Sequence, residues 1–126
     1  MTDEDSQRPS VLLLEDDTSL AEMIMFTLGR EFEIERAANA EEAGLLIAAR
    51  SFDVLLCDYL LPGRQQGLEF LVEAMDRQPK ARRILMTGYI NPDMISRSIT
   101  VAGLTACLMK PVDMGELRRH LHKASA

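Results

Sequence analysis

The sequence predicts an α/β domain in which helices cover both faces of a doubly wound, five-stranded parallel sheet. Three observations support this fold class. Short apolar runs alternate five times with amphipathic stretches along the 126 residues, which is the pattern of a repeated βα unit. The first, third and fourth apolar runs are continuous and do not alternate with polar residues, as expected of strands buried on both faces. Because such crossovers are right-handed, few topologies remain, and we expect the strand order 2-1-3-4-5.

Each strand is predicted from an apolar run, and each helix from the amphipathic stretch that follows it. The strands fall near residues 10 to 15, 32 to 36, 53 to 57, 82 to 86 and 105 to 109. The helices fall near residues 17 to 29, 39 to 50, 67 to 76, 92 to 101 and 113 to 123. We therefore expect the chain to read as five consecutive βα units.

The helix boundaries are predicted from residues that cap helices. Short polar side chains accept hydrogen bonds from the unpaired N–H groups at the start of a helix. Such residues precede four of the predicted helices, namely Asp17 or Thr18, Asn39, Asn91 before Pro92, and Asp113. Gly29 and Gly103 close the first and the fourth helix.

The large apolar side chains are expected to fill the core on both sides of the sheet. This group contains the four phenylalanines and several of the methionines: Phe26, Phe32, Phe52, Phe70, Met23, Met25, Met75, Met86 and Met109.

The composition is that of one globular domain. Hydrophobic residues make up 47% of the chain and charged residues 27%, which are ordinary values for such a domain. We expect residues 10–124 to fold together after a flexible tail of residues 1–9. No apolar run approaches the roughly 20 residues of a membrane helix, and the amino terminus has no secretory signal. We therefore expect a cytoplasmic protein with no membrane partner.

The cysteines and the net charge restrict the class further. Cys57 and Cys107 lie in strand-like runs, and two cysteines do not make a disulfide framework. We expect both thiols to be reduced and buried. The net charge of -6 argues against nonspecific binding of nucleic acid, so we expect no direct nucleic-acid partner.

Carboxylates follow two strands at the edge of the sheet where folds of this kind bind ligands. Glu15 and Asp16 end the first apolar run, and Asp58 ends the third. The expected strand order places these runs side by side at the switch point. Three carboxylates within about 4 Å of one another repel by roughly 4 kcal/mol per pair, so a cation is needed. Oxygen ligands favour Mg²⁺, which also bridges a carboxylate to a phosphoryl oxygen.

Two further strand ends supply groups suited to phosphoryl chemistry on Asp58. Lys110 offers a point charge to a transferred phosphoryl group, and the hydroxyl of Thr87 can donate a hydrogen bond to another of its oxygens. The bond from Lys110 to Pro111 is a candidate for the cis form. Together these residues indicate that Asp58 is a phosphoryl acceptor.

From Ser10 to about Lys123 the chain resembles the receiver domain of two-component response regulators, whose CheY-like members have a flavodoxin-like fold. The resemblance is carried by four motifs in family order and at about family spacing. These are Leu14-Glu15-Asp16-Asp17, Asp58 followed by Pro62-Gly63, Met86-Thr87-Gly88, and Lys110-Pro111.

This resemblance implies a role for each site residue. Asp58 would be the phosphoacceptor, and Asp16, Asp58 and the backbone carbonyl of Leu60 would ligate Mg²⁺. Glu15 would act through a water on the metal. Thr87 would be the switch hydroxyl, and Lys110 would pair with the phosphoryl oxygens. The domain would be a phosphoacceptor that assists its own phosphorylation and dephosphorylation, and not an enzyme with a separate substrate.

The chain departs from the family pattern at two places that bear on switching. The family usually has an aromatic residue three positions before the lysine, and here that residue is Cys107. We hypothesise that Tyr89 supplies a substitute ring. The stretch from Pro62 to Gly67 is one residue longer than the common family loop, so we expect a reshaped approach to the third helix.

Other functions fit the sequence less well. An aspartate-nucleophile phosphatase of the haloacid dehalogenase type has a second aspartate two residues after its nucleophile, where this chain has Leu60. A flavodoxin needs a phosphate-binding loop after the first strand, and Glu15, Asp16 and Asp17 would repel a phosphate there. A phosphorylation-independent interaction module with the same fold remains open, favoured by Cys107 and opposed by the complete acidic, threonine and lysine set.

The family resemblance also implies the partners. The phosphodonor would be a phosphohistidine on a histidine kinase or on a histidine phosphotransfer protein. The output would be an unknown downstream protein, or a homodimer formed through residues 92–101, 105–109 and 113–123. Because the chain ends just after its last predicted helix, we expect it to act alone or to be an excised piece.

Overall fold

The predicted architecture is confirmed in the computed structural model, which describes residues 8–59, 67–88 and 92–126. Five parallel strands form one sheet in the order β2-β1-β3-β4-β5. They are β1 (Ser10–Leu14), β2 (Glu33–Ala37), β3 (Val54–Asp58), β4 (Arg82–Thr87) and β5 (Ala106–Met109). Each bound lies within one residue of its prediction. Residues 1–7 of the expected tail lie outside the described residues.

The helices alternate with the strands, and three of them begin where their capping residues predict. They are α2 (Thr18–Leu28), α3 (Ala40–Ala49), α4 (Gly67–Arg77), α5 (Pro92–Ala102) and α6 (Met114–Ser125). Asp17 accepts from the N–H of Leu20, Asn39 from that of Glu42, and Asp113 from those of Gly115 and Glu116. Asn91 lies outside the described residues.

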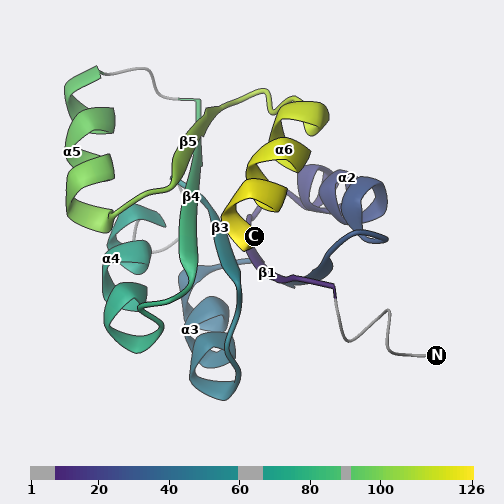
Figure 1. The fold of residues 1–126 in the computed structure, drawn as a ribbon, viewed down its shortest axis with the longest axis horizontal. Helices are drawn as coiled ribbons and strands as arrows, with labels where there is room; N and C mark the ends of the chain where they lie inside the picture. The colour runs from purple at the N-terminus through teal and green to yellow at the C-terminus, as the bar shows by residue number, and fades with distance from the viewer. Residues whose placement is uncertain (1–7, 60–66, 89–91) are drawn as a thin grey trace.

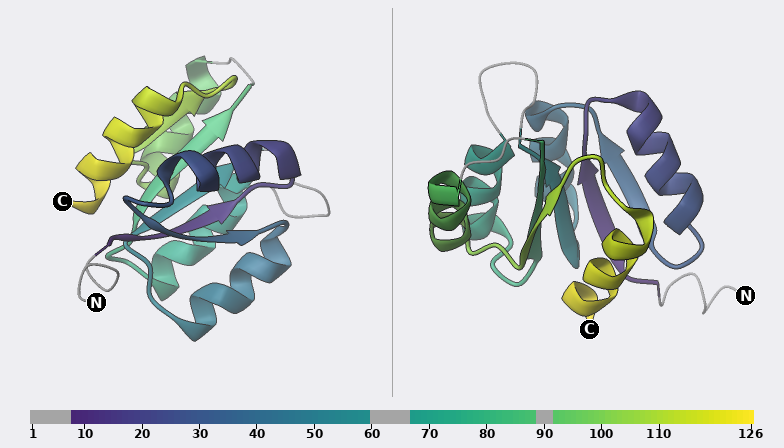
Figure 2. Two further views of the ribbon diagram at one scale, coloured as in Figure 1. Left: turned by 90° about the vertical axis from the view of Figure 1, so that its right-hand side faces the viewer. Right: turned by 90° about the horizontal axis from the view of Figure 1, so that it is seen from above.

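The sheet is the middle layer of three. Figures 1 and 2 show α2 and α6 on one face and α3, α4 and α5 on the other. Odd and even positions of the central strands therefore enter different cores, because successive side chains of a strand point to opposite faces. Val11 and Leu13 pack with α2 and α6, whereas Leu12 and Leu14 pack with the other three helices. The continuous apolar strands result from this double coverage.

Four predictions of burial were wrong, and their positions explain why. Phe26 is 91% exposed and Met23 is 53% exposed on the outer side of α2. The helix carries apolar residues around most of its circumference, so its sequence does not show which face is buried. Met109 is 37% exposed and Cys107 is half-buried because both lie on β5, an edge strand with one neighbouring strand. Cys57, in the central strand β3, is buried, and both thiols are free.

Among the described residues, no helix has both the length and the apolar character needed to cross a membrane.

Candidate functional site

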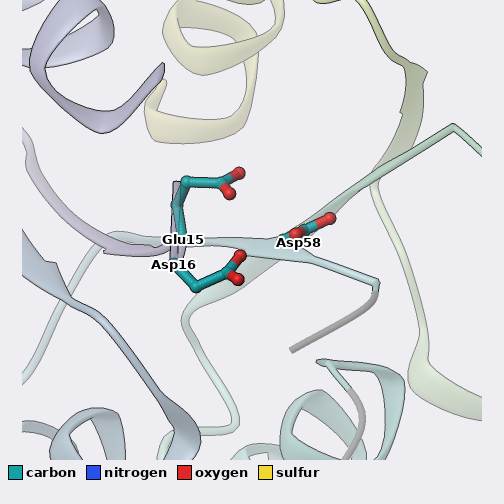
Figure 3. A group of neighbouring side chains, drawn as sticks. All are labelled: Glu15, Asp16 and Asp58. Carbon is teal, nitrogen blue, oxygen red and sulfur yellow. The ribbon is translucent and has the colours of Figure 1, made fainter. Parts of the chain in front are cut away.

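Three carboxylates meet at the carboxyl edge of the two central strands. Glu15 and Asp16 directly follow β1, and Asp58 is the last residue of β3, which pairs with β1. Each residue offers one oxygen atom, and these atoms all lie within 4.8 Å of one another. Figure 3 shows the Glu15 and Asp16 carboxylates extending from the end of β1 toward the side where Asp58 lies. The structure thus brings together the acidic residues that the sequence singled out.

The acidic cluster is buried at its base and open on one side. The side chain of Glu15 is fully buried and Asp58 is 6% exposed, whereas Asp16 is exposed to solvent. Among the three carboxylates, Asp16 is therefore the one that faces solvent.

Lys110 supplies the positive charge of this cluster from the end of β5. Its Nζ lies 3.1 Å from Oε1 of Glu15 and 3.1 Å from Oδ1 of Asp58. Its side chain is 24% exposed, so Lys110 contacts the buried carboxylates and also remains partly accessible to solvent. Lysine presents a compact point charge here, which is able to pair with either a carboxylate or a phosphoryl oxygen.

The local environment raises the pKa of both members of this pair. Burial raises the pKa of Glu15 above 4.5, although hydrogen bonds from the Asp17 backbone and from Lys110 act in the opposite direction. Burial lowers the pKa of Lys110, but its hydrogen bond to Glu15 and the charge of Asp58 outweigh this, so the pKa lies above 10.5. Lys110 is thus a permanent cation at neutral pH.

Thr87 ends the neighbouring strand β4 and is 1% exposed. In the β3–β4 ladder Asp58 lies opposite Met86, so Thr87 is one position further toward the site edge. The carbonyl of Thr87 accepts a hydrogen bond of 2.9 Å from the Lys110 N–H, which connects the ends of β4 and β5. The Lys110–Pro111 peptide bond is cis, as the sequence suggested.

The donor set fits a hard divalent cation. All three candidate ligands are carboxylates, and oxygen ligands in a small, partly open cluster are what Mg²⁺ takes up while it retains some of its waters. The backbone carbonyl of Leu60, expected as a further ligand, lies outside the described residues. So does Tyr89, the expected substitute ring.

Sequence reasoning missed Gly67 as a residue that shapes this site. Gly67 begins α4, and its N–H donates a 2.9 Å hydrogen bond to the carbonyl of Tyr59. A Cβ atom at this position would overlap the carbonyl oxygen of Asp58 and crowd the Sγ of Cys57. Only glycine permits such a close backbone approach. The sequence predicts a longer loop just before Gly67, and residues 62–66 of that loop lie outside the described residues.

The second residue missed was Arg36 of β2. Its guanidinium group donates hydrogen bonds to the carbonyl oxygens of Glu15, at 3.0 and 3.1 Å, and of Asp16, at 3.2 Å. By sequence, an arginine in a strand that also carries two glutamates is an ordinary solvent-facing residue, so no signal pointed to this contact.

Comparisons with known proteins agree with this geometry. A family model described as the response regulator receiver domain matches residues 11–122. The sensor histidine kinase AruS of Pseudomonas aeruginosa is 38% identical over 118 residues, which cover 88% of this chain and 11% of that protein. The response regulator protein PilR of the same organism is 33% identical over 112 residues, which cover 88% of this chain and 25% of that protein.

The fold matches solved structures as well. A response regulator receiver domain protein (CheY-like) from Methanospirillum hungatei superposes with a TM-score of 0.85 and 30% identity, over 93% of each chain. This chain spans about a quarter of the length of PilR and less of AruS.

Proposed function

This chain belongs to the response regulator receiver domain family, and from that membership we propose that Asp58 accepts the phosphoryl group. The domain is homologous to response regulators of two-component systems, which places its chemistry in phosphoryl transfer. The observation that carries the assignment is the contact of Lys110 with both Glu15 and Asp58 at the open edge of the sheet. No other described aspartate combines burial with a neighbouring lysine and two further carboxylates.

The transfer needs an attacking oxygen and groups that stabilise the transferred charge. An Asp58 carboxylate oxygen attacks phosphorus, a P–O bond forms, and the P–N bond to a phosphohistidine breaks. Lys110 then exchanges its contact with Asp58 for one with a phosphoryl oxygen. The hydroxyl of Thr87 donates a hydrogen bond to another oxygen of the same group. Attack of water on phosphorus later returns the carboxylate and releases phosphate, so the domain assists both steps on itself.

A resident Mg²⁺ ion would be held by Asp16 and Asp58, with Glu15 acting through water. When bound, the ion neutralises charge on the carboxylates and on the phosphoryl oxygens during transfer. The fully buried Glu15 also fixes Lys110 in reach of Asp58, which is a role of the side chains themselves.

The proposed phosphodonor is a histidine kinase or a histidine phosphotransfer protein. A sensor histidine kinase among the relatives supports this choice. The downstream partner is proposed to read a surface that changes with phosphorylation, formed by α5, β5 and α6, either as another protein or as a second copy of the domain.

The assignment of Asp58 is tested with Mg²⁺ and a small phosphodonor such as acetyl phosphate. We expect the intact mass to increase by one base-labile phosphoryl group, and Asp58→Asn to abolish the increase. Asp113→Asn is the matched control, because asparagine also caps a helix start and the α6 cap is retained. Phosphorylation that persists in Asp58→Asn would reject Asp58 as the acceptor. No phosphorylation of the wild type would favour the phosphorylation-independent module.

A further inference from the structure

Arg36 reaches from an edge strand across the end of β1 to the backbone of the acidic cluster. It is the fourth residue of β2 and lies opposite Leu13 in the β1–β2 ladder. Its Nε and Nη2 donate to the carbonyl oxygen of Glu15 at 3.1 and 3.0 Å, and Nη2 also donates to that of Asp16 at 3.2 Å. Nη2 also lies 3.5 Å from the hydroxyl of Thr18, the first residue of α2, which is a longer contact. Among the described contacts of Arg36 there is none with Asp58 or Lys110, so we expect it to act on the cluster mainly through the two backbone carbonyls.

The directions of the Glu15 and Asp16 carbonyl groups are coupled to the directions of the two side chains. In an extended strand, successive carbonyls and successive side chains point to opposite sides. Continued strand geometry would therefore send the Glu15 and Asp16 carboxylates apart. Here both consecutive carbonyls point to one guanidinium group, and both carboxylates meet Asp58. The turn between Glu15 and Asp16 thus coincides with the contact to Arg36.

Other contacts fix the turn from its remaining sides. The N–H of Glu15 donates to the carbonyl of Ala37 at 3.1 Å, which extends the β1–β2 ladder by one bond. The N–H of Asp17 donates to Oε2 of Glu15 at 3.1 Å. These bonds therefore hold the N–H groups of Glu15 and Asp17, and Arg36 holds the carbonyl groups of Glu15 and Asp16.

We propose that Arg36 is a positioning residue that sets the affinity of the acidic cluster for a divalent cation. It does so by holding the Glu15–Asp16 turn in the form that directs both carboxylates toward Asp58. The proposal rests on the proposed function, since it concerns the same cluster. Groups that orient metal ligands from the outer shell commonly contribute about tenfold to metal affinity.

The direction in which Mg²⁺ affinity changes when Arg36 is replaced tests this proposal. Arg36 carries a positive charge close to the cluster, so its removal leaves the cluster more negative. On charge alone, a variant without this arginine binds Mg²⁺ more tightly. If Arg36 acts by positioning, the same variant binds Mg²⁺ more weakly. Lysine separates the two further, because it keeps the charge but lacks the planar fork that reaches both carbonyls.

The experiment is a calorimetric titration of the full chain with Mg²⁺ alone, without any phosphodonor. We expect Arg36→Gln to weaken Mg²⁺ binding by about tenfold, and Arg36→Lys to weaken it in the same direction. The N–H of Asp17 should exchange faster with solvent in both variants, since its acceptor Glu15 is less well placed. If Arg36→Gln fails to fold, the Mg²⁺ affinity of Arg36→Lys alone is compared with that of the wild type.

Arg50→Gln is the matched control. Arg50 also contacts β2, with its guanidinium 2.7 Å from Glu33 and 3.3 Å from Glu35, but these residues are in the earlier part of the strand. The same loss of charge there should leave Mg²⁺ affinity within a small factor of wild type. Unchanged or tighter binding in both Arg36 variants would overturn the positioning role. Absence of Mg²⁺ binding by the wild type would instead reject the metal site of the proposed function.

Discussion

Lys110 is the residue on which the charge balance of the acidic cluster depends. Its ammonium group contacts Glu15 and Asp58 at 3.1 Å each, and Glu15 is fully buried. A buried carboxylate is tolerated only when a hydrogen bond or an opposite charge compensates for the water it has lost. Lys110 therefore has a structural task in addition to its proposed task in phosphoryl transfer.

Replacing this lysine should lower stability and increase the effect of Mg²⁺. We expect Lys110→Met to reduce the free energy of unfolding by about 2 kcal/mol, because a hydrogen bond to a charged, buried group is lost. Mg²⁺ should then raise the Tm of the variant more than that of the wild type. Both quantities are measured by thermal and urea unfolding with and without the ion.

Lys123→Met is the control for this substitution, since Lys123 is an exposed residue of α6. It should change neither stability nor the response to Mg²⁺. Equal stability of Lys110→Met and the wild type would show that Glu15 needs no compensation from Lys110.

At the scale of single elements, helix starts were predictable and helix faces were not. Asp17, Asn39 and Asp113 cap their helices as predicted because capping is a local interaction between a side chain and nearby N–H groups. Which side of α2 faces the sheet is decided by packing against distant residues. Phe26 of α2 is 91% exposed, whereas Phe32, which follows the helix and is just as apolar, is fully buried.

Replacing glycine with alanine should have opposite effects on stability in α3 and in α4. Gly67→Ala should destabilise the protein and impair phosphorylation, because the added Cβ meets the backbone of Asp58, which cannot move without displacing the site. Gly44→Ala should stabilise it by about 0.5–1 kcal/mol, because alanine favours a helix interior more than glycine does. The space around Gly44 is open for a Cβ atom.

Urea unfolding and the phosphorylation rate with a small phosphodonor measure both variants. A Gly67→Ala protein as stable and as active as the wild type would contradict the close approach of α4 to β3.

At the scale of the whole molecule, the sequence was sufficient for the topology and for the placement of four candidate site residues. Strand order follows from right-handed crossovers, and the strand ends carry Glu15, Asp16, Asp58 and Lys110 to one edge. Arg36 could not be found in this way. Its contact joins a side chain of one strand to backbone carbonyls of another, and backbone groups are identical in every sequence.

Side chains at the protein surface also join the last helix, α6, to the segment between α2 and β2. Glu31 lies between α2 and β2, and its carboxylate is 2.9 Å from Nε of Arg118 and 2.7 Å from Nε2 of His122. The His122 ring also packs against Phe32, with 4.6 Å between centroids. These contacts fasten α6 to the first half of the domain.

This surface contact should make stability depend on pH. The hydrogen bond with His122, followed by the bond and charge of Arg118, lowers the pKa of Glu31 below 4.5 despite some burial. A carboxylate with a lowered pKa stabilises the fold above its unfolded-state pKa, and this contribution is lost as the pH falls through the folded-state value. The stability difference between wild type and Glu31→Gln should therefore shrink as the pH falls from about 6 to about 3.

Urea unfolding at each pH measures this difference. Glu22→Gln, at an exposed carboxylate of α2, provides the comparison. A difference for Glu31→Gln that stays constant with pH would show that the ionised form of Glu31 does not contribute.

The distance along the chain between Glu15 and Lys110 has a biological consequence. The two residues are 95 positions apart, so the cluster of charged groups around Asp58 forms only after the first and last strands have joined the same sheet. A chain still emerging from the ribosome would therefore carry Asp58 before Lys110 is available to it. Until β5 has joined the sheet, Asp58 lacks the ammonium group that lies 3.1 Å from it in the folded domain.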